Sequence, residues 1–146
     1  MILQNLFENT HDVIYYMAYG MLTDPEVMQG IDMVGAAVLE GYAFEFAQFA
    51  NIYPSPGSKV YGTLWAIDAG VLSELDQIEG YPDFYTRHQV TVRSQAQDYT
   101  AQVYVMTKQS RQDLQAVSPS KAYLQRLMRG YQHAGLPLQQ IRSAQS

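Results

Sequence analysis

One carboxylate in this 146-residue chain sits where helical periodicity would bury it. Residues 69–79 predict a short amphipathic helix, with Asp68 as its N-cap and Gly80 as the residue that ends it. At 100° per residue, Glu79 falls inside the apolar arc of this helix. The arc comprises Val71, Leu72, Leu75 and Ile78. Burial and the negative end of the helix dipole both disfavour a charged carboxylate there, so its pKa is expected nearer neutrality, as an acid–base catalyst requires.

Glu79 also has an ordinary interpretation, as a residue at the end of a helix that is capped or paired with Arg87. Twelve tyrosines are many for a chain of this length, and some are expected to line a polar pocket. No nucleophile-elbow or phosphate-loop motif occurs in the sequence. An active site would therefore consist of one carboxylic acid, backbone donors and tyrosines. That set suits an intramolecular acyl transfer, in which the substrate supplies its own nucleophile.

The backbone donors are expected at a glycine turn near the N-terminus. Residues 13–18 (VIYYMA) form an apolar run typical of a buried strand, and Gly20 follows it. Residues 23–26 (TDPE) then offer Thr23 or Asp24 as the N-cap of a helix. Free N–H groups at such a place can hold an anion or a carboxylate. The same pattern is also that of an ordinary strand-to-helix turn, and both interpretations stay open.

Length and composition indicate one domain. At 146 residues, with 47% hydrophobic and 16% charged residues, the chain is typical of a globular protein with a buried core. Residues 1–12 are expected to be an N-terminal extension and residues 139–146 a polar tail. The order of the predicted strands and helices favours the α+β class.

Charge and composition exclude several other kinds of function. The net charge is −5 with no basic cluster, which argues against nucleic-acid and anionic-membrane partners. The chain has no cysteine, and His11, His88 and His133 lack the spacing of metal ligands. No apolar run has the length of a membrane span, and residues 1–12 contain none of signal-peptide length. A cytoplasmic location is therefore expected.

Hydrophobic periodicity predicts the elements that must position these groups. Strands are predicted at residues 13–18, 60–67, 84–93 and 99–106. Residues 34–49 predict one or two strands with a bend at Gly41. Residues 53–58 (YPSPGS) predict a turn, and residues 94–98 predict the loop of a hairpin.

The last third of the chain is predicted to be mainly helical. Residues 108–117 suggest a brief helix, and a longer one begins at Ser118-Pro119 and ends at Gly135. Its apolar stripe is interpreted as core packing and not as a ligand site. The stripe comprises Tyr123, Leu124, Leu127, Met128 and Tyr131. Gly130 in mid-helix indicates a close approach to the sheet.

Five motifs, in order along residues 13–138, resemble the gamma-glutamylcyclotransferase-like family. They are Tyr19-Gly20 after a strand, VYGTLW at 60–65, LDQIEG at 75–80, VYV at 103–105, and PSxxY with Gly130, Gly135 and Leu136-Pro137 at 119–137. The resemblance includes the plant-type, gamma-glutamylamine and butirosin-processing branches of the family. It implies a small mixed β-barrel with flanking helices.

The resemblance also implies a reaction and a set of site residues. In that reaction the α-amine of a small gamma-glutamyl amine or peptide attacks its own γ-carbonyl, which releases 5-oxoproline and a free amine without a metal or organic cofactor. The acid–base glutamate falls on Glu79, and the backbone N–H groups of residues 20–22 would hold the glutamyl carboxylate and the oxyanion. The implied substrate-binding residues are Tyr19, Gly20, Met21, Leu22, Tyr85 and Tyr104.

One position departs from the family pattern. The glycine is usually followed by serine or threonine, and here Met21 follows it. Backbone contacts survive this change, whereas a side-chain hydroxyl contact does not. Three hypotheses therefore remain: a gamma-glutamyl cyclotransferase, a non-catalytic module that binds small molecules in the same pocket, and an interaction protein that keeps the fold. The leaving amine stays open, and the chain is expected to be a monomer or a homodimer.

Overall fold

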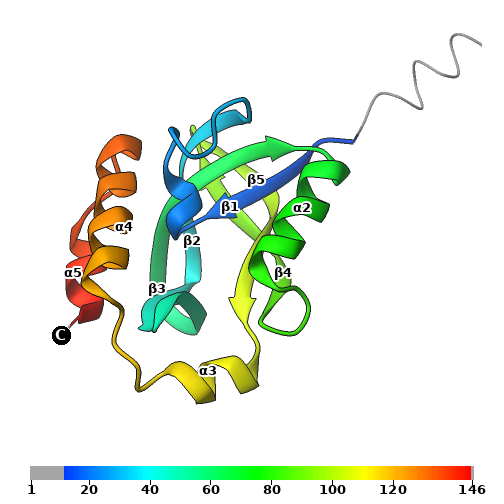
Figure 1. Cartoon of the computed structure of the whole chain (residues 1–146). Coiled ribbons are helices and arrows are strands. Elements are labelled where there is room, and N and C mark those ends of the chain that lie inside the picture. The colour runs from blue at the N-terminus through cyan, green and yellow to red at the C-terminus, as the bar shows by residue number, and fades with distance from the viewer. Residues whose placement is uncertain (1–11, 146) are drawn as a thin grey trace, which may run out of the picture.

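Five strands close into a barrel in the computed structural model of this protein, which describes residues 12–145 (Figure 1). They are β1 (Ile14–Ala18), β2 (Asp32–Ala47), β3 (Phe49–Ile67), β4 (Tyr85–Ser94) and β5 (Gln97–Met106). Their order around the barrel is β1-β3-β2-β4-β5. Strands β1 and β5, which close the barrel, pair in parallel, and the other pairs are antiparallel. The predicted α+β class with a small mixed β-barrel is confirmed.

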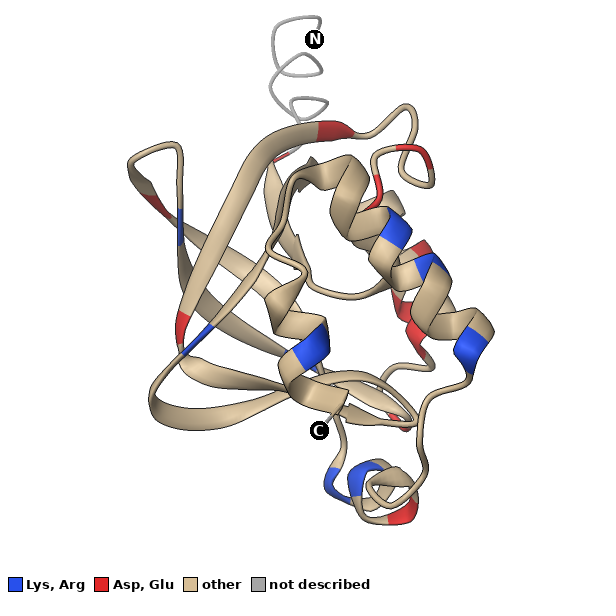
Figure 2. Ribbon diagram, turned by 90° about the vertical axis from the view of Figure 1, so that its left-hand side faces the viewer, with Lys and Arg blue, Asp and Glu red and all other residues tan. Residues whose placement is uncertain are grey.

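Helices flank the barrel. Within residues 12–145 they are the 3₁₀ helix η1 (Met21–Thr23), α2 (Ala69–Glu79), α3 (Lys108–Leu114), α4 (Lys121–Ala134) and α5 (Gln139–Gln145). Helix α2 lies on one side of the barrel, α4 and α5 lie on the other, and α3 lies below it in the view of Figure 1. Figure 2 shows the same barrel from the side of α4 and α5, with the basic residues of α4 along its exposed face. None of these helices has both the length and the apolar character that a membrane crossing needs.

Three apolar layers fix the helices on the barrel. Fully buried side chains from all five strands fill its interior, including those of Met17, Leu39, Ile52, Leu64, Val92 and Val103. A second layer, which includes Trp65, packs the outside of the barrel against α2. A third layer lies under α4 and α5 and contains Leu127, Tyr131 and Ile141.

Helix α2 begins and ends where the sequence predicts, because both of its caps are local. The Asp68 carboxylate accepts a hydrogen bond from the N–H of Val71 at 2.9 Å, and Gly80 adopts the left-handed conformation with φ of 67°. The prediction for Ile78 is wrong, because this side chain is 68% exposed. Compared with the predicted apolar arc, the face of α2 that packs on the barrel excludes Ile78 and still includes Glu79.

The β4–β5 hairpin also forms as predicted. Gln95 and Ala96, with φ of 51° and 62°, make its two-residue turn. Along β5 the side chains alternate, so that Val103 points into the barrel and Tyr104 points outward into the layer against α2. This alternation places Tyr104 beside the end of α2.

The long β2–β3 hairpin differs from the prediction. Residues 53–58, predicted as a turn, lie inside β3, and pairing with β2 continues on both sides, at Pro54 and at Lys59. The last four residues of this segment stand opposite Gly41, whose φ is 85°, and form a bulge. The bend at Gly41 is confirmed. The predicted turn is wrong because strand pairing on both sides overrides the turn preference of proline and glycine.

The predicted helix after Gly20 does not form. The chain makes the short η1 and then turns through residues 25–30. Asp24 does not cap a helix: its carboxylate accepts a hydrogen bond from the N–H of Glu26 at 2.9 Å and contacts Nδ1 of His133, also at 2.9 Å. These tertiary and turn contacts replace the helical hydrogen bonds that the TDPE sequence suggested.

Helix α4 begins later than predicted and packs on the turn after Gly20. Ser120, and not Ser118, is its N-cap, because the Ser120 hydroxyl accepts a hydrogen bond from the N–H of Tyr123 at 3.1 Å. A Cβ on Gly130 would lie 3.1 Å from Cβ of Asp24. The close approach at Gly130 is therefore to the turn after η1, and not to the sheet as predicted.

Residues 139–145 are not a polar tail. They form α5, in which Ile141 is fully buried. The Gln140 side chain accepts a hydrogen bond from the N–H of Tyr61 and donates one to the Tyr61 carbonyl, both at 2.8 Å. The helix is thus tied to β3. Residues 1–11, which include His11 and most of the predicted N-terminal extension, lie outside the described residues.

Candidate active site

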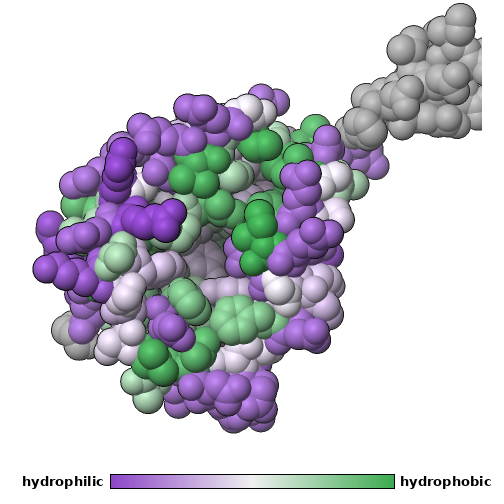
Figure 3. Space-filling view, viewed as in Figure 1, coloured by the Kyte–Doolittle hydropathy of each residue, from purple (hydrophilic) through white to green (hydrophobic). Residues whose placement is uncertain are grey.

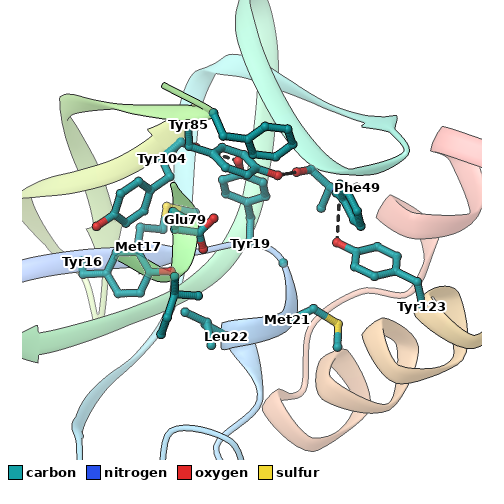
Figure 4. A pocket seen from close by; sticks show the side chains of 14 residues that line it. Tyr16, Met17, Tyr19, Met21, Leu22, Phe49, Glu79, Tyr85, Tyr104 and Tyr123 are labelled. Carbon is teal, nitrogen blue, oxygen red and sulfur yellow. Dashed lines mark hydrogen bonds between the residues drawn. The ribbon is translucent and has the colours of Figure 1, made fainter. Parts of the chain in front are cut away.

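A cavity of about 290 Å³ lies between the Gly20 turn, the C-terminal end of α2 and the outer face of the barrel. Hydrophobic residues lie at several places around the hollow in Figure 3, with more hydrophilic ones between them, and Figure 4 shows the lining from close by. The lining residues are Tyr16, Met17, Tyr19, Gly20, Met21, Leu22, Phe49, Ala50, Ile78, Glu79, Phe84, Tyr85, Tyr104 and Tyr123. The structure thus brings together all seven residues that the family resemblance implied.

Glu79 is the last residue of α2, and among the described residues that line the cavity it alone has a charged side chain. Within residues 12–145 its carboxylate has no hydrogen-bond or ion-pair partner. Burial raises the pKa of Glu79 to about 7. The predicted alternative, a pair with Arg87, is not observed, because Arg87 contacts Asp76 instead. Glu79 therefore has the environment of an acid–base group that exchanges protons near neutral pH.

Asp76 lies one helical turn before Glu79 and forms an ion pair with Arg87. Arg87 Nε lies 2.9 Å from Asp76 Oδ1 without the alignment of a hydrogen bond, and the Tyr104 hydroxyl donates to the same oxygen at 2.7 Å. The guanidinium also stacks over the ring of Tyr81 at 4.4 Å. The sequence placed Asp76 only at the edge of the apolar arc. Its partners come from β4 and β5, so helical periodicity alone could not identify them.

Three of the tyrosines that line the cavity donate their hydroxyl proton in a hydrogen bond within the protein. Tyr19 donates to the backbone carbonyl of Tyr104 at 2.6 Å, and Tyr85 donates to the carbonyl of Ala50 at 2.7 Å. Tyr104 donates to Asp76, as described above. The oxygens of these hydroxyls can still accept a hydrogen bond from a ligand, but their protons are engaged.

Two further tyrosines that line the cavity have a hydroxyl proton that no described residue accepts, and neither was among the site residues predicted from the sequence. Tyr123 of α4 accepts a hydrogen bond from the N–H of Ala50 at 2.9 Å, which leaves its own O–H available. Tyr16 of β1 is only 3% exposed, and its hydroxyl has no hydrogen-bond partner within residues 12–145. It points into the cavity on the Glu79 side (Figure 4). The signal for Tyr16 was its alternation with Met17, which puts it on the outer face of the barrel.

The Gly20 turn lines the cavity, and hydrogen bonds to its carbonyl groups hold it in place. The Thr23 N–H donates to the Gly20 carbonyl at 3.1 Å, so the N–H groups of residues 20–22 precede the first helical hydrogen bond. The Tyr131 hydroxyl donates to the carbonyl of Tyr19 at 2.6 Å and links the turn to α4. These contacts hold the N–H groups in place without using them.

A cluster of Asp24, Glu26 and His133 lies on the α4 side of this turn, with ligand atoms within 4.8 Å of one another. Sequence spacing did not reveal it. Asp24 already contacts His133 Nδ1 and the Glu26 N–H, and Arg129 lies 3.6 Å from Glu26. An adjacent guanidinium disfavours a bound cation, so the cluster is better described as a polar contact between α4 and the turn.

Residues 16–125 match the family model described as "Gamma-glutamyl cyclotransferase, AIG2-like". The chain belongs to this family. A gamma-glutamylcyclotransferase of Bos taurus is 35% identical over 92 residues, which are 62% of this chain and 46% of that protein. The match thus spans about half the length of this relative.

Solved structures share the fold. A structure named gamma-glutamyl cyclotransferase superposes with a TM-score of 0.75 at 23% identity, over 92% of this chain and 88% of that one. An uncharacterised protein from Homo sapiens superposes with a TM-score of 0.78 at 24% identity, over 93% of this chain and 88% of that one. The barrel with its flanking helices is therefore the fold of this family.

Proposed function

We propose that the protein is a gamma-glutamyl cyclotransferase, which converts a small gamma-glutamyl amine or peptide into 5-oxoproline and a free amine. One observation carries this proposal: a buried carboxylate without a partner among the described residues, Glu79, faces a cavity beside free backbone N–H groups in a chain of this family. The reaction needs one group that moves protons and donors that hold an oxyanion, and the cavity offers both.

Glu79 is the proposed acid–base group. Its carboxylate takes a proton from the α-ammonium of the substrate, and the freed amine attacks the γ-carbonyl to form the new C–N bond of the lactam. Glu79 then passes this proton to the departing nitrogen as the amide C–N bond breaks and the carbonyl re-forms. The attacking nitrogen, which is positively charged after the attack, loses its second proton to the regenerated Glu79 carboxylate, and that proton passes on to the free amine or to water. A pKa of about 7 suits both steps, because the group accepts and releases protons at little cost near neutral pH.

The Gly20 turn and Tyr16 supply the proposed hydrogen-bond donors. The N–H groups of residues 20–22 bind the α-carboxylate of the glutamyl moiety. The Tyr16 hydroxyl donates to the γ-carbonyl oxygen while negative charge develops on it. Burial, and then the charge of Glu79, raise the pKa of the Tyr16 hydroxyl well above its ordinary value, so it remains a donor. The oxygens of Tyr85 and Tyr104 accept from the α-ammonium.

Release of 5-oxoproline from a panel of gamma-glutamyl amines and dipeptides tests the reaction class. We expect release by the native protein, with kcat/KM rising as the pH increases to about 7, because Glu79 must lose its proton before it can act as a base. Chromatography of 5-oxoproline across a pH range of about 5 to 8.5 measures this. A pH-independent kcat/KM over that range would contradict the role of Glu79.

A non-catalytic binding module is the second candidate, and Met21 is the observation that favours it. Met21 lines the cavity at a position where the family usually has a hydroxyl side chain. If the panel releases no 5-oxoproline while calorimetry detects saturable binding of the same compounds, this candidate replaces the first. Absence of both release and binding would favour an interaction protein that keeps only the fold.

Tyr16→Phe tests the proposed oxyanion donor. We expect kcat to fall about 10²-fold with little change in KM, because the lost hydrogen bond forms mainly in the transition state. Tyr15→Phe is the matched control, since Tyr15 precedes it on β1, is absent from the cavity lining and should change kcat less than about twofold. Equal effects of the two substitutions would remove Tyr16 from the mechanism.

A further inference from the structure

The outer part of the cavity is built from partly exposed apolar side chains. Phe49 contacts Tyr123 and Phe84 edge to face, with ring centroids 5.5 Å and 6.3 Å apart, so the three rings form a continuous aromatic wall. Met21 and Leu22 lie on the other side of the cavity from Phe49 in Figure 4. A thioether and aromatic ring edges adapt well to a flat or branched apolar group.

No cation lines this cavity within the described part of the chain. Arg87 is engaged by Asp76 behind Tyr104, and Arg129 lies beside Glu26 on the other face of the turn. Arg126 of α4 is exposed and is not part of the lining. Among the lining residues that the structure describes, Glu79 carries the single charge, and this charge repels a further anion.

Hydrogen-bond donors are equally few. The N–H groups of residues 20–22 and the Tyr16 hydroxyl are assigned to the glutamyl carboxylate and the γ-carbonyl. The remaining free donor among the described lining side chains is the Tyr123 hydroxyl, which borders the outer part. One neutral hydrogen bond does not compensate for the transfer of a carboxylate from water to an apolar wall.

We propose that the leaving amine is an apolar amine without a carboxylate group, so that the substrate is a gamma-glutamyl alkyl- or arylalkylamide and not a gamma-glutamyl amino acid or peptide. This proposal rests on the cyclotransferase function proposed above. The amide C–N bond breaks, the departing nitrogen takes its proton from Glu79, and the apolar body of the amine lies against Met21, Phe49 and Phe84. An amino acid would bring a carboxylate to the same wall.

Three matched substrates test this proposal on the full-length protein. They are gamma-glutamyl-2-phenylethylamide, gamma-glutamyl-phenylalanine, which differs only by its added carboxylate, and gamma-glutamyl-phenylalaninamide, in which that carboxylate is a neutral amide of similar size. We expect kcat/KM for the phenylethylamide to exceed that for the phenylalanine compound by at least about tenfold. The kcat/KM for the phenylalaninamide should lie within about threefold of that for the phenylethylamide, because the cavity is expected to exclude the charge of the carboxylate and not its size.

The outcomes separate this inference from the proposed function. Release of 5-oxoproline from none of the three compounds would count against the cyclotransferase itself. Equal or faster turnover of the phenylalanine compound would overturn the inference and leave the reaction class intact, and loss of that turnover in Arg126→Ala would assign the recognition to the exposed arginine. Rejection of both the phenylalanine compound and its amide would also overturn it, because size would then be the cause.

Discussion

Glu79→Gln is expected to reduce kcat/KM for 5-oxoproline release by about 10²–10⁴-fold, the range typical of a lost general acid–base group. Glutamine keeps the size of the side chain and removes its ability to exchange a proton. Because Glu79 has no hydrogen-bond or ion-pair partner within residues 12–145, the substitution breaks no structural contact. Binding of the glutamyl moiety should therefore change much less than turnover.

The same substitution is expected to stabilise the protein at high pH. The folded-state pKa of Glu79 is raised from 4.5 to about 7, so the native state disfavours the charged form. The resulting destabilisation is absent below pH 4.5, grows between pH 4.5 and about 7 and is complete above that range. Glutamine avoids it, and the gain in the free energy of unfolding at a pH of about 8 is at most on the order of 3 kcal/mol.

Thermal unfolding of both proteins at a pH of about 5 and of about 8 measures this effect. The melting temperature of Glu79→Gln should exceed that of the native protein by several degrees at the higher pH and by much less at the lower. Glu74→Gln, on the exposed face of the same helix, is the matched control and should show no such pH dependence. A variant that loses both activity and stability would mean that Glu79 has a structural role. A variant that stays active would remove it from the mechanism.

Gly62→Ala is expected to destabilise the fold by more than about 3 kcal/mol. Gly62 lies on β3, where a Cβ would overlap the carbonyl oxygen of Ala18 and come within 2.9 Å of Cε of Met17. Backbone in the middle of a closed barrel has no room to move away. Since β1 continues from Ala18 into the Gly20 turn, the substitution should also displace the proposed carboxylate-binding N–H groups.

Urea unfolding of Gly62→Ala beside Gly57→Ala separates this clash from the general cost of replacing a glycine. Gly57 has φ of 84°, and no atom lies within 4 Å of the position that a Cβ would take there. Its substitution therefore costs only backbone strain, about 1–2 kcal/mol. We expect a clearly larger loss for Gly62→Ala. Equal losses for the two variants would show that the barrel accommodates a methyl group beside Ala18.

Local chemistry in the sequence determined helix α2 and the inward position of its last residue. Asp68 and Gly80 define the ends of the helix through hydrogen bonds to neighbours in the chain, and the 3.6-residue period sets the direction of Glu79. The hairpin at residues 94–98 was predictable for the same reason. The resemblance to the family then selected the Gly20 turn, Tyr85 and Tyr104, which the structure places around one cavity.

Long-range packing decided the rest. The sequence of residues 53–58 prefers a turn, yet pairing with β2 at Pro54 and at Lys59 keeps the segment within β3 as a bulge. The apolar stripe of α4 looks like core, yet Tyr123 borders the cavity because that helix packs on the Gly20 turn. Tyr16 has the pattern of a buried strand residue, and only the space left between β1 and α2 gives its hydroxyl a free position. Periodicity shows which side of an element is buried, but tertiary structure decides whether that side meets packed atoms or a cavity.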